Sequence, residues 1–186
     1  MTNNVHLSAE LTYLRVRGIL AHFAEASQRY RIPLALLLAV ASRESRMGLA
    51  LDENWTGDHG YGIGIMQIDK RYHGGFTQAH RNDDHQANID YGAGFLASLV
   101  QAFDGDIPHA VAAYNSGESR VRSAMYAGLD PNTVTTGRDY ARDVLARRRA
   151  IENLLGMARA TSKAAYLLPA GLIGLLTYNY LNTSDL

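Results

Sequence analysis

The chain has 186 residues, 47% of them apolar, with 18 basic and 18 acidic side chains and therefore no formal net charge. This length supports one domain with a substantial core but not two comfortable ones. Zero net charge gives no global field of the kind that attracts nucleic acid, and the absence of cysteine excludes a fold that depends on disulfides.

The first quarter of the chain predicts two helices. The first extends from a cap at Ser8 to about Tyr30, with apolar residues at loosely helical spacing. The second has Pro33 in its first turn and ends at about Met47, where Gly48 stops it. Because this second helix is apolar nearly all round, we expect it to be the central, buried helix.

The glycine-rich residues 50–82 predict turns, with a small sheet or irregular loops. Helical periodicity then returns. Helices are expected over four further segments, residues 89–103, 108–115, 119–126 and 137–155, the last capped by Thr136. The predicted fold is therefore mainly α with a very small or irregular β region.

The C-terminal segment from Ala164 to Leu181 carries no charged residue over 18 positions. That length just reaches what a helix needs to cross a bilayer, while Pro169, Asn179 and two glycines weaken this interpretation. A membrane-active or anchoring segment and a helix packed on the domain both stay open.

The central helix brings one carboxylate into apolar surroundings. Glu44 follows Leu37, Val40 and Ala41 by seven, four and three positions, so it shares their inward face. Burial there favours the neutral acid by raising the pKa, which suits a general acid for glycoside cleavage. The alternative is a buried glutamate in a salt bridge with Arg43 or Arg46.

Two further carboxylates, Asp58 and Asp69, lie in the glycine-rich loops that follow. Such loops can fold over the end of the helix and place a second acid across a cleft, and glycines let a sugar ring approach the backbone. Each aspartate alone is more often a turn residue. Together, beside Glu44, they predict a two-carboxylate site.

Four blocks carry a specific resemblance: SRESRMG (42–48), GDHGYGIGIMQIDKRYH (57–73), AAYNSGESRVRS (112–123) and TTGRDYARDVLAR (135–147). In order and spacing they resemble the goose-type lysozymes, relatives of the lytic transglycosylases, over roughly residues 8–155. The resemblance implies a lysozyme-like α+β fold whose central helix ends at the catalytic glutamate. We expect a catalytic domain at residues 1–158 and a tail at 159–186, which has no counterpart in the family domain.

The resemblance also implies roles for single residues. Glu44 matches the catalytic acid, and Asp58 and Asp69 match the aspartates that position or activate the attacking water. Residues that match the substrate-binding groups are Gly62, Gln67, His73, Phe95, Tyr114, Asn115 and Tyr140. Among them, Gly62 would act through its backbone, Gln67 would support its neighbours, and Tyr140 would reach toward Glu44.

Other interpretations of these residues stay open. Tyr114 and Tyr140 could be core residues whose hydroxyls are satisfied, and Asn115 could cap a short helix. No histidine has partners at metal-ligand spacing, and residues 83–85 (Asp-Asp-His) are interpreted as a polar turn before a helix. We therefore expect neither a metal nor a cofactor.

The implied activity is that of a muramidase, a glycoside hydrolase that cuts the β-1,4 bond between N-acetylmuramic acid and N-acetylglucosamine, with inversion. Glu44 would protonate the leaving oxygen, and Asp69, helped by Asp58, would hold the attacking water. One alternative is a lytic transglycosylase, which forms an anhydro ring without an aspartate partner. Another is a wall-binding or membrane-inserting protein without activity.

The expected partner is the peptidoglycan glycan strand, with possible membrane contact through residues 164–181, no nucleic acid, and a monomeric state. The N-terminal residues lack the basic start and long apolar run of a secretory signal. An enzyme acting at the bacterial wall, in the periplasm or outside the cell, would then be released by a phage or delivered by dedicated secretion.

Overall fold

A computed structural model describes residues 4–167, with side chains described from residue 6 to residue 156. Its helices are α1 (Asn4–Val16), α2 (Ile19–Tyr30), α3 (Leu34–Ser45), α4 (Gly74–Ala79), α5 (His85–Ala102), α6 (Ile107–Ser116), α7 (Glu118–Tyr126) and α8 (Tyr140–Leu167). Three short strands and three 3₁₀ turns complete this part of the chain. The prediction of a mainly α fold with a very small β region is confirmed.

The core forms around α3, as the sequence predicts. Every residue from Ala35 to Ser42 is buried, including Leu36, Leu37 and Leu38. Apolar side chains of the neighbouring helices are also fully buried, among them Leu7, Leu14, Phe23, Ile89, Leu96 and Val111. A helix that is apolar all round is stable only when other elements cover it on every side, which is what these helices do.

The start of the chain corrects one prediction. Two helices occupy the segment expected to form one, and Ser8 lies inside α1 instead of capping it. The helix is interrupted at Gly18, whose φ of 74° is readily adopted only by glycine. Apolar spacing continues across the break, which is why the sequence pattern conceals it.

The two ends of the predicted helices that matter for the site are also shifted. α3 ends at Ser45, because Arg46 and Met47 already have positive φ angles before Gly48 is reached. α8 begins at Tyr140, not at residue 137. Thr136 starts a 3₁₀ turn, η3 (Thr136–Arg138), and does not cap the long helix.

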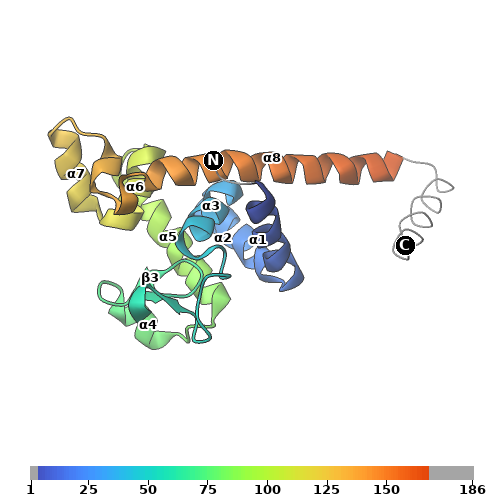
Figure 1. Cartoon of the computed structure of the whole chain (residues 1–186), viewed down its shortest axis with the longest axis horizontal. Helices are drawn as coiled ribbons and strands as arrows, with labels where there is room; N and C mark the ends of the chain where they lie inside the picture. Colours follow the sequence, from blue (N-terminus) through green and yellow to red (C-terminus); the bar gives the residue numbers. More distant parts are fainter. Residues whose placement is uncertain (1–3, 168–186) are drawn as a thin grey trace. The chain divides into compact units, whose positions relative to one another are not determined.

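The glycine-rich segment folds into an antiparallel sheet of three strands of two residues each, β1 (Thr56–Gly57), β2 (Gly62–Ile63) and β3 (Ile68–Asp69). Gly62 pairs with Asp69 and Ile63 with Ile68. Figure 1 shows the sheet and α4 at one end of α5, and α6 and α7 at its other end. The central helix α3 and both of these groups therefore meet around α5.

Contacts within the chain divide it into two units, Met1–Ile151 and Glu152–Leu186. The predicted boundary at residue 158 stays a prediction. Of the uncharged segment 164–181, all but its first four residues lie outside the described part of the chain. Among residues 4–167, no helix has both the length and the apolar character needed to cross a bilayer.

Candidate active site

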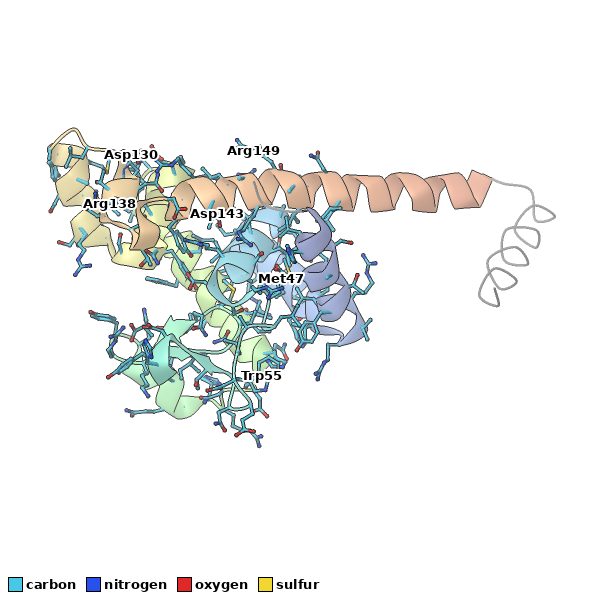
Figure 2. All side chains as sticks on the ribbon, viewed as in Figure 1. Met47, Trp55, Asp130, Arg138, Asp143 and Arg149 are labelled. Carbon is cyan, nitrogen blue, oxygen red and sulfur yellow. The ribbon has the colours of Figure 1, made fainter. Side chains whose placement is uncertain are left out.

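The end of α3 is fixed to the sheet by Ser45. This buried serine donates a hydrogen bond from Oγ to the carbonyl oxygen of Ile65 (2.7 Å) and accepts one from the amide of Gly48 (2.9 Å). Figure 2 shows Met47, which is fully buried, at the turn that follows the helix. The residue before Ser45 is therefore held at the junction of the helix and the loops.

That residue is Glu44, whose side chain is partly exposed. Burial raises the pKa of Glu44 from its ordinary value of 4.5 to about 7, although a hydrogen bond from Tyr140 and the charge of Arg43 act in the opposite direction. The negative charge of Asp58 raises this pKa further. The hydroxyl of Tyr140 donates to Oε1 of Glu44, so Oε2 is left to carry the proton.

Asp58 and Asp69 are brought together by Arg71. Its guanidinium contacts both oxygens of Asp69, the shortest distance being 2.5 Å from Nη2 to Oδ2, and lies 3.4 Å from Oδ2 of Asp58. Hydrogen bonds from Arg71 lower the pKa of Asp69 below its ordinary value. The environment of Glu44 thus favours the protonated acid, and the environment of Asp69 favours the ionised form.

Gln67 shapes the loop that carries the aspartates. Its side chain donates to the carbonyl oxygen of Gly64 (2.9 Å) and lies against Gly57 and Gly62. A Cβ atom added at either of these two glycines would lie within 2.3 Å of Oε1 of Gln67. A larger residue at either position would displace the side chain of Gln67, which packs against the strands β1 and β2.

A cleft of about 670 Å³ lies between the loop after β3 and the helices α6 and α7. Its lining includes six of the predicted residues: Gln67, Asp69, His73, Phe95, Tyr114 and Asn115. Three of them form an aromatic row, in which the ring of Phe95 lies 4.9 Å from His73 and 5.3 Å from Tyr114, centroid to centroid. Such rows suit the apolar faces of sugar rings.

Hydrogen bonds fix this row in place. Nδ1 of His73 lies 2.9 Å from the hydroxyl of Tyr91, and burial lowers the pKa of His73. Tyr114 donates to the carbonyl oxygen of Met66 (2.9 Å), and burial raises its pKa, so it stays a neutral donor. Asn115 accepts from the amide of Thr136 (2.8 Å), which joins α6 to η3.

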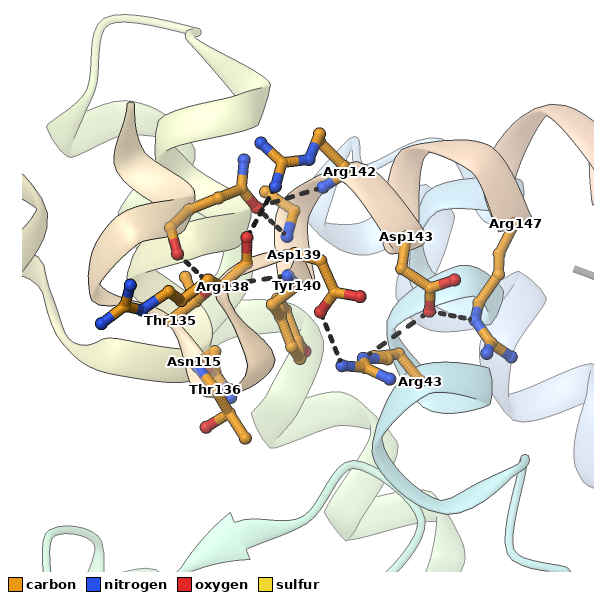
Figure 3. Close-up of polar contacts among 12 residues, drawn as sticks. Arg43, Asn115, Thr135, Thr136, Arg138, Asp139, Tyr140, Arg142, Asp143 and Arg147 are labelled. Carbon is orange, nitrogen blue, oxygen red and sulfur yellow. Dashed lines mark hydrogen bonds and ion pairs between the residues drawn. The ribbon is translucent and has the colours of Figure 1, made fainter. Parts of the chain in front are cut away.

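Tyr140 is placed by a polar network at the start of α8, drawn in Figure 3. Arg43 lies 3.2 Å from Oδ1 of Asp139 and 3.6 Å from Oδ2 of Asp143, and its guanidinium carbon lies 5.7 Å from the centre of the Tyr140 ring. Arg147 contacts Asp143 (2.7 Å) from one turn further along. This network joins α8 to the helix that carries Glu44.

The remaining predicted residues lie beside the cleft and not in its lining. They are Glu44, Asp58, Gly62 and Tyr140. Glu44 and Tyr140 are joined by a hydrogen bond, Gly62 pairs with Asp69 in the sheet, and Asp58 contacts Arg71. The structure therefore brings the whole predicted set to one region, with the acid at the edge of the open volume.

Residues 9–152 match the family described as Lysozyme g. The chain belongs to the lysozyme g family. Lysozyme g of Takifugu rubripes is 32% identical over 163 residues, which cover 81% of this chain and 83% of that protein. Lysozyme G of Dromaius novaehollandiae is 33% identical over 66% of this chain, and lysozyme g of Gallus gallus is 34% identical over 61%. The matches span 60% and 54% of these two bird proteins.

Membership of the lysozyme g family confirms the resemblance that the four blocks predict, while the roles of single residues stay predictions. Sequence reasoning missed Arg71, Ser45 and the buried Asn88. Asn88 accepts from the amide of Met66 (2.8 Å) and donates to the carbonyl oxygen of Ile63 (2.9 Å), so it ties the sheet to α5. An asparagine beside the apolar positions of residues 89–99 is the signal that could have identified it.

Within residues 4–167 no group of three or more acidic or histidine side chains could hold a metal ion. Residues 83 and 84 precede α5, as interpreted from the sequence, but His85 is already its first residue, and Asp84 caps the helix by accepting from the amide of Ala87.

Proposed function

We propose that the protein is a muramidase that hydrolyses the β-1,4 bond between N-acetylmuramic acid and N-acetylglucosamine in peptidoglycan. The observation that carries this proposal is the contrast between two kinds of carboxyl group in one site. Glu44 is desolvated and bonded to Tyr140, whereas Asp69 is bonded to Arg71. Opposite protonation states are what acid-catalysed glycoside hydrolysis requires. Membership of the lysozyme g family supports the same activity.

In the proposed reaction, the glycan lies in the cleft with its sugars against the row of His73, Phe95 and Tyr114. Glu44 donates its proton from Oε2 to the glycosidic oxygen as the bond to the anomeric carbon breaks. A water held by Asp58 and Asp69 attacks that carbon from the opposite face and gives up a proton to the carboxylates. The configuration then inverts, a route that needs the acid and base about 6.5–9.5 Å apart.

Several features support this division of roles. The location of Glu44 in the last turn of α3 places it at the negative end of the helix dipole, which also favours the neutral acid. Asp58 has a positive φ of 47°, a conformation that costs energy and is concentrated at functional sites. Its negative charge contributes to the raised pKa of Glu44.

The test is the substitution Glu44→Gln, which keeps the shape and the bond from Tyr140 but removes the acid. We expect lysis of peptidoglycan to be abolished while the variant stays folded. Glu25→Gln, an exposed change on α2, is the matched control and should lyse normally. If the Glu44→Gln variant clears peptidoglycan at the wild-type rate, the proposal is wrong.

Product analysis separates the proposal from its closest alternative. A hydrolase leaves reducing muramic acid ends, whereas a lytic transglycosylase leaves anhydro ends, and mass spectrometry distinguishes the two. NMR of the fresh product then reports whether the anomeric configuration is inverted.

We also place the site of action at the bacterial cell wall, outside the cytoplasmic membrane, with the chain acting as a monomer.

A further inference from the structure

Arg71 bonds to both aspartates of the site, and the reaction proposed above gives it no step of its own. Its Nε lies 2.9 Å from Oδ1 and 3.1 Å from Oδ2 of Asp69, and its Nη2 lies 2.5 Å from Oδ2. Its backbone amide also donates to Oδ1 of Asp69 (2.8 Å). Asp69 is therefore held by one residue through both of its oxygens, a forked geometry that only arginine offers.

The same guanidinium reaches the second aspartate. Nη2 lies 3.4 Å from Oδ2 of Asp58, so a single nitrogen contacts both carboxylates. The guanidinium carbon lies 4.2 Å from the centre of the Tyr61 ring and 5.9 Å from that of Tyr72. These two aromatic contacts limit the directions in which the arginine can point and keep it between the aspartates.

Two carboxylates this close to one cation would repel each other if the cation were removed. One of them would then retain a proton to a higher pH, as paired acids do. The other charged or titratable groups around the pair are His59, Lys70 and His73 on the same side, Glu44 at the end of α3, and Glu118 and Arg120 across the cleft. Within the described part of the chain, Arg71 bonds to both carboxylates, and none of these other groups does.

We infer that Arg71 is a positioning residue for the hydrolysis, which holds the carboxyl groups of Asp58 and Asp69 side by side on one guanidinium. The inference rests on the proposed function, because it gives the pair the task of holding the attacking water. Arg71 acts through the aspartates and takes no proton itself. Its loss should therefore change the pH at which the base becomes active, in addition to the rate.

The test compares the pH dependence of kcat/KM for the wild type and Arg71→Gln from about pH 2.5, below the ordinary pKa of an aspartate, to about pH 8. The acid limb reports the base of the free enzyme. Losing a bonded cation typically raises a carboxyl pKa by about one unit or more. We therefore expect the limb to move up by about one pH unit. Because the pKa of Asp69 starts below its ordinary value, the extra activity loss should approach roughly tenfold only toward the acid end of this range, below both limbs, and should disappear by about pH 7.

The chain offers a matched control in Arg81, which bonds to Asp83 with the same spacing of two residues, at 2.9 Å and 2.8 Å, away from the cleft. Arg81→Gln should keep the wild-type profile. Arg71→Lys keeps the charge but lacks the fork, so it should restore the position of the acid limb with a reduced kcat. A lysine variant with wild-type kcat contradicts the inference.

The two proposals fail in different ways. A wild-type chain that releases no reducing muramic ends overturns the proposed function and this inference with it. A wild type that releases them, with an Arg71→Gln variant whose acid limb is unmoved, overturns this inference alone. That conclusion holds whether the variant has the normal rate or a rate reduced by the same factor at every pH. A loss that is the same at every pH would mean that Arg71 stabilises the loop but does not affect the pKa of the aspartates.

Discussion

A partly buried acid with a raised pKa has a measurable cost in stability. The pKa of Glu44 is about 7 in the folded chain against 4.5 when solvated, so the folded state binds more protons than the unfolded state between these values. The free energy of unfolding therefore falls as the pH rises through this window. A difference of 2.5 pKa units at about 1.36 kcal/mol each corresponds to about 3 kcal/mol lost by pH 8.

Glu44→Gln should recover that loss, because glutamine resembles the neutral acid at every pH. The variant and the wild type should be about equally stable near pH 4, and the variant should be more stable by about 3 kcal/mol near pH 8. For a chain of this size the gain corresponds to a Tm higher by roughly 6–12 °C. Thermal and urea unfolding of both proteins at the two pH values measure it. Comparing variant with wild type cancels the titration of the groups that do not interact with Glu44.

A stability difference that is the same at both pH values would refute the reasoning. It would mean that the carboxyl group of Glu44 is solvated enough to ionise normally in the folded state. The proposed acid would then lose its proton well below neutral pH, and activity at pH 7 would need another proton donor.

Three further predictions follow from single contacts. Tyr140→Phe removes the hydrogen bond that lowers the pKa of Glu44, so the alkaline limb of the kcat/KM profile should move to higher pH; an unmoved limb would show that the bond does not reach the acid. Asn88→Ala removes the hydrogen bonds to the amide of Met66 and the carbonyl of Ile63, which should lower the free energy of unfolding in urea by about 2–3 kcal/mol. The control Gln86→Ala, at an exposed position of the same helix, should change it by less than about 0.5 kcal/mol. A chain ending at residue 158 should still lyse peptidoglycan in a turbidity assay; loss of lysis with an intact fold would assign the tail a part in the activity.

Local sequence patterns predicted the fold correctly where the conformation of an element depends mainly on its own residues. The apolar run of α3 and the small sheet among the glycines both agree with the structure. The failures lie at element boundaries. Gly18 separates α1 from α2 although apolar spacing continues across it, and α3 ends in two left-handed non-glycine residues, Arg46 and Met47, whose conformation depends on packing.

The chemistry-bearing residues were identifiable for a different reason. Glu44 could be assigned to a buried face from helical spacing alone, and the resemblance of the four blocks then gave it a role. Arg71 could not be found in this way, because a charged residue in a polar loop is ordinarily solvated. Its significance depends on two carboxylates, 2 and 13 positions away, that only the folded loop brings to one guanidinium.

The site as a whole separates two protonation states with two different physical devices. On one side, burial disfavours the charge of Glu44, and Tyr140, which is 96 residues distant in sequence, fixes which oxygen is free. On the other side, Arg71 favours the charge of Asp69 at the solvent-facing edge of the sheet. Desolvation is the largest influence on the pKa of Glu44, whereas the hydrogen bonds from Arg71, a residue of the same loop, are the largest influence on that of Asp69. The acid therefore depends on the packing of α3 against α8, and the base depends on the loop alone, so substitutions in these two regions should move opposite limbs of the pH profile.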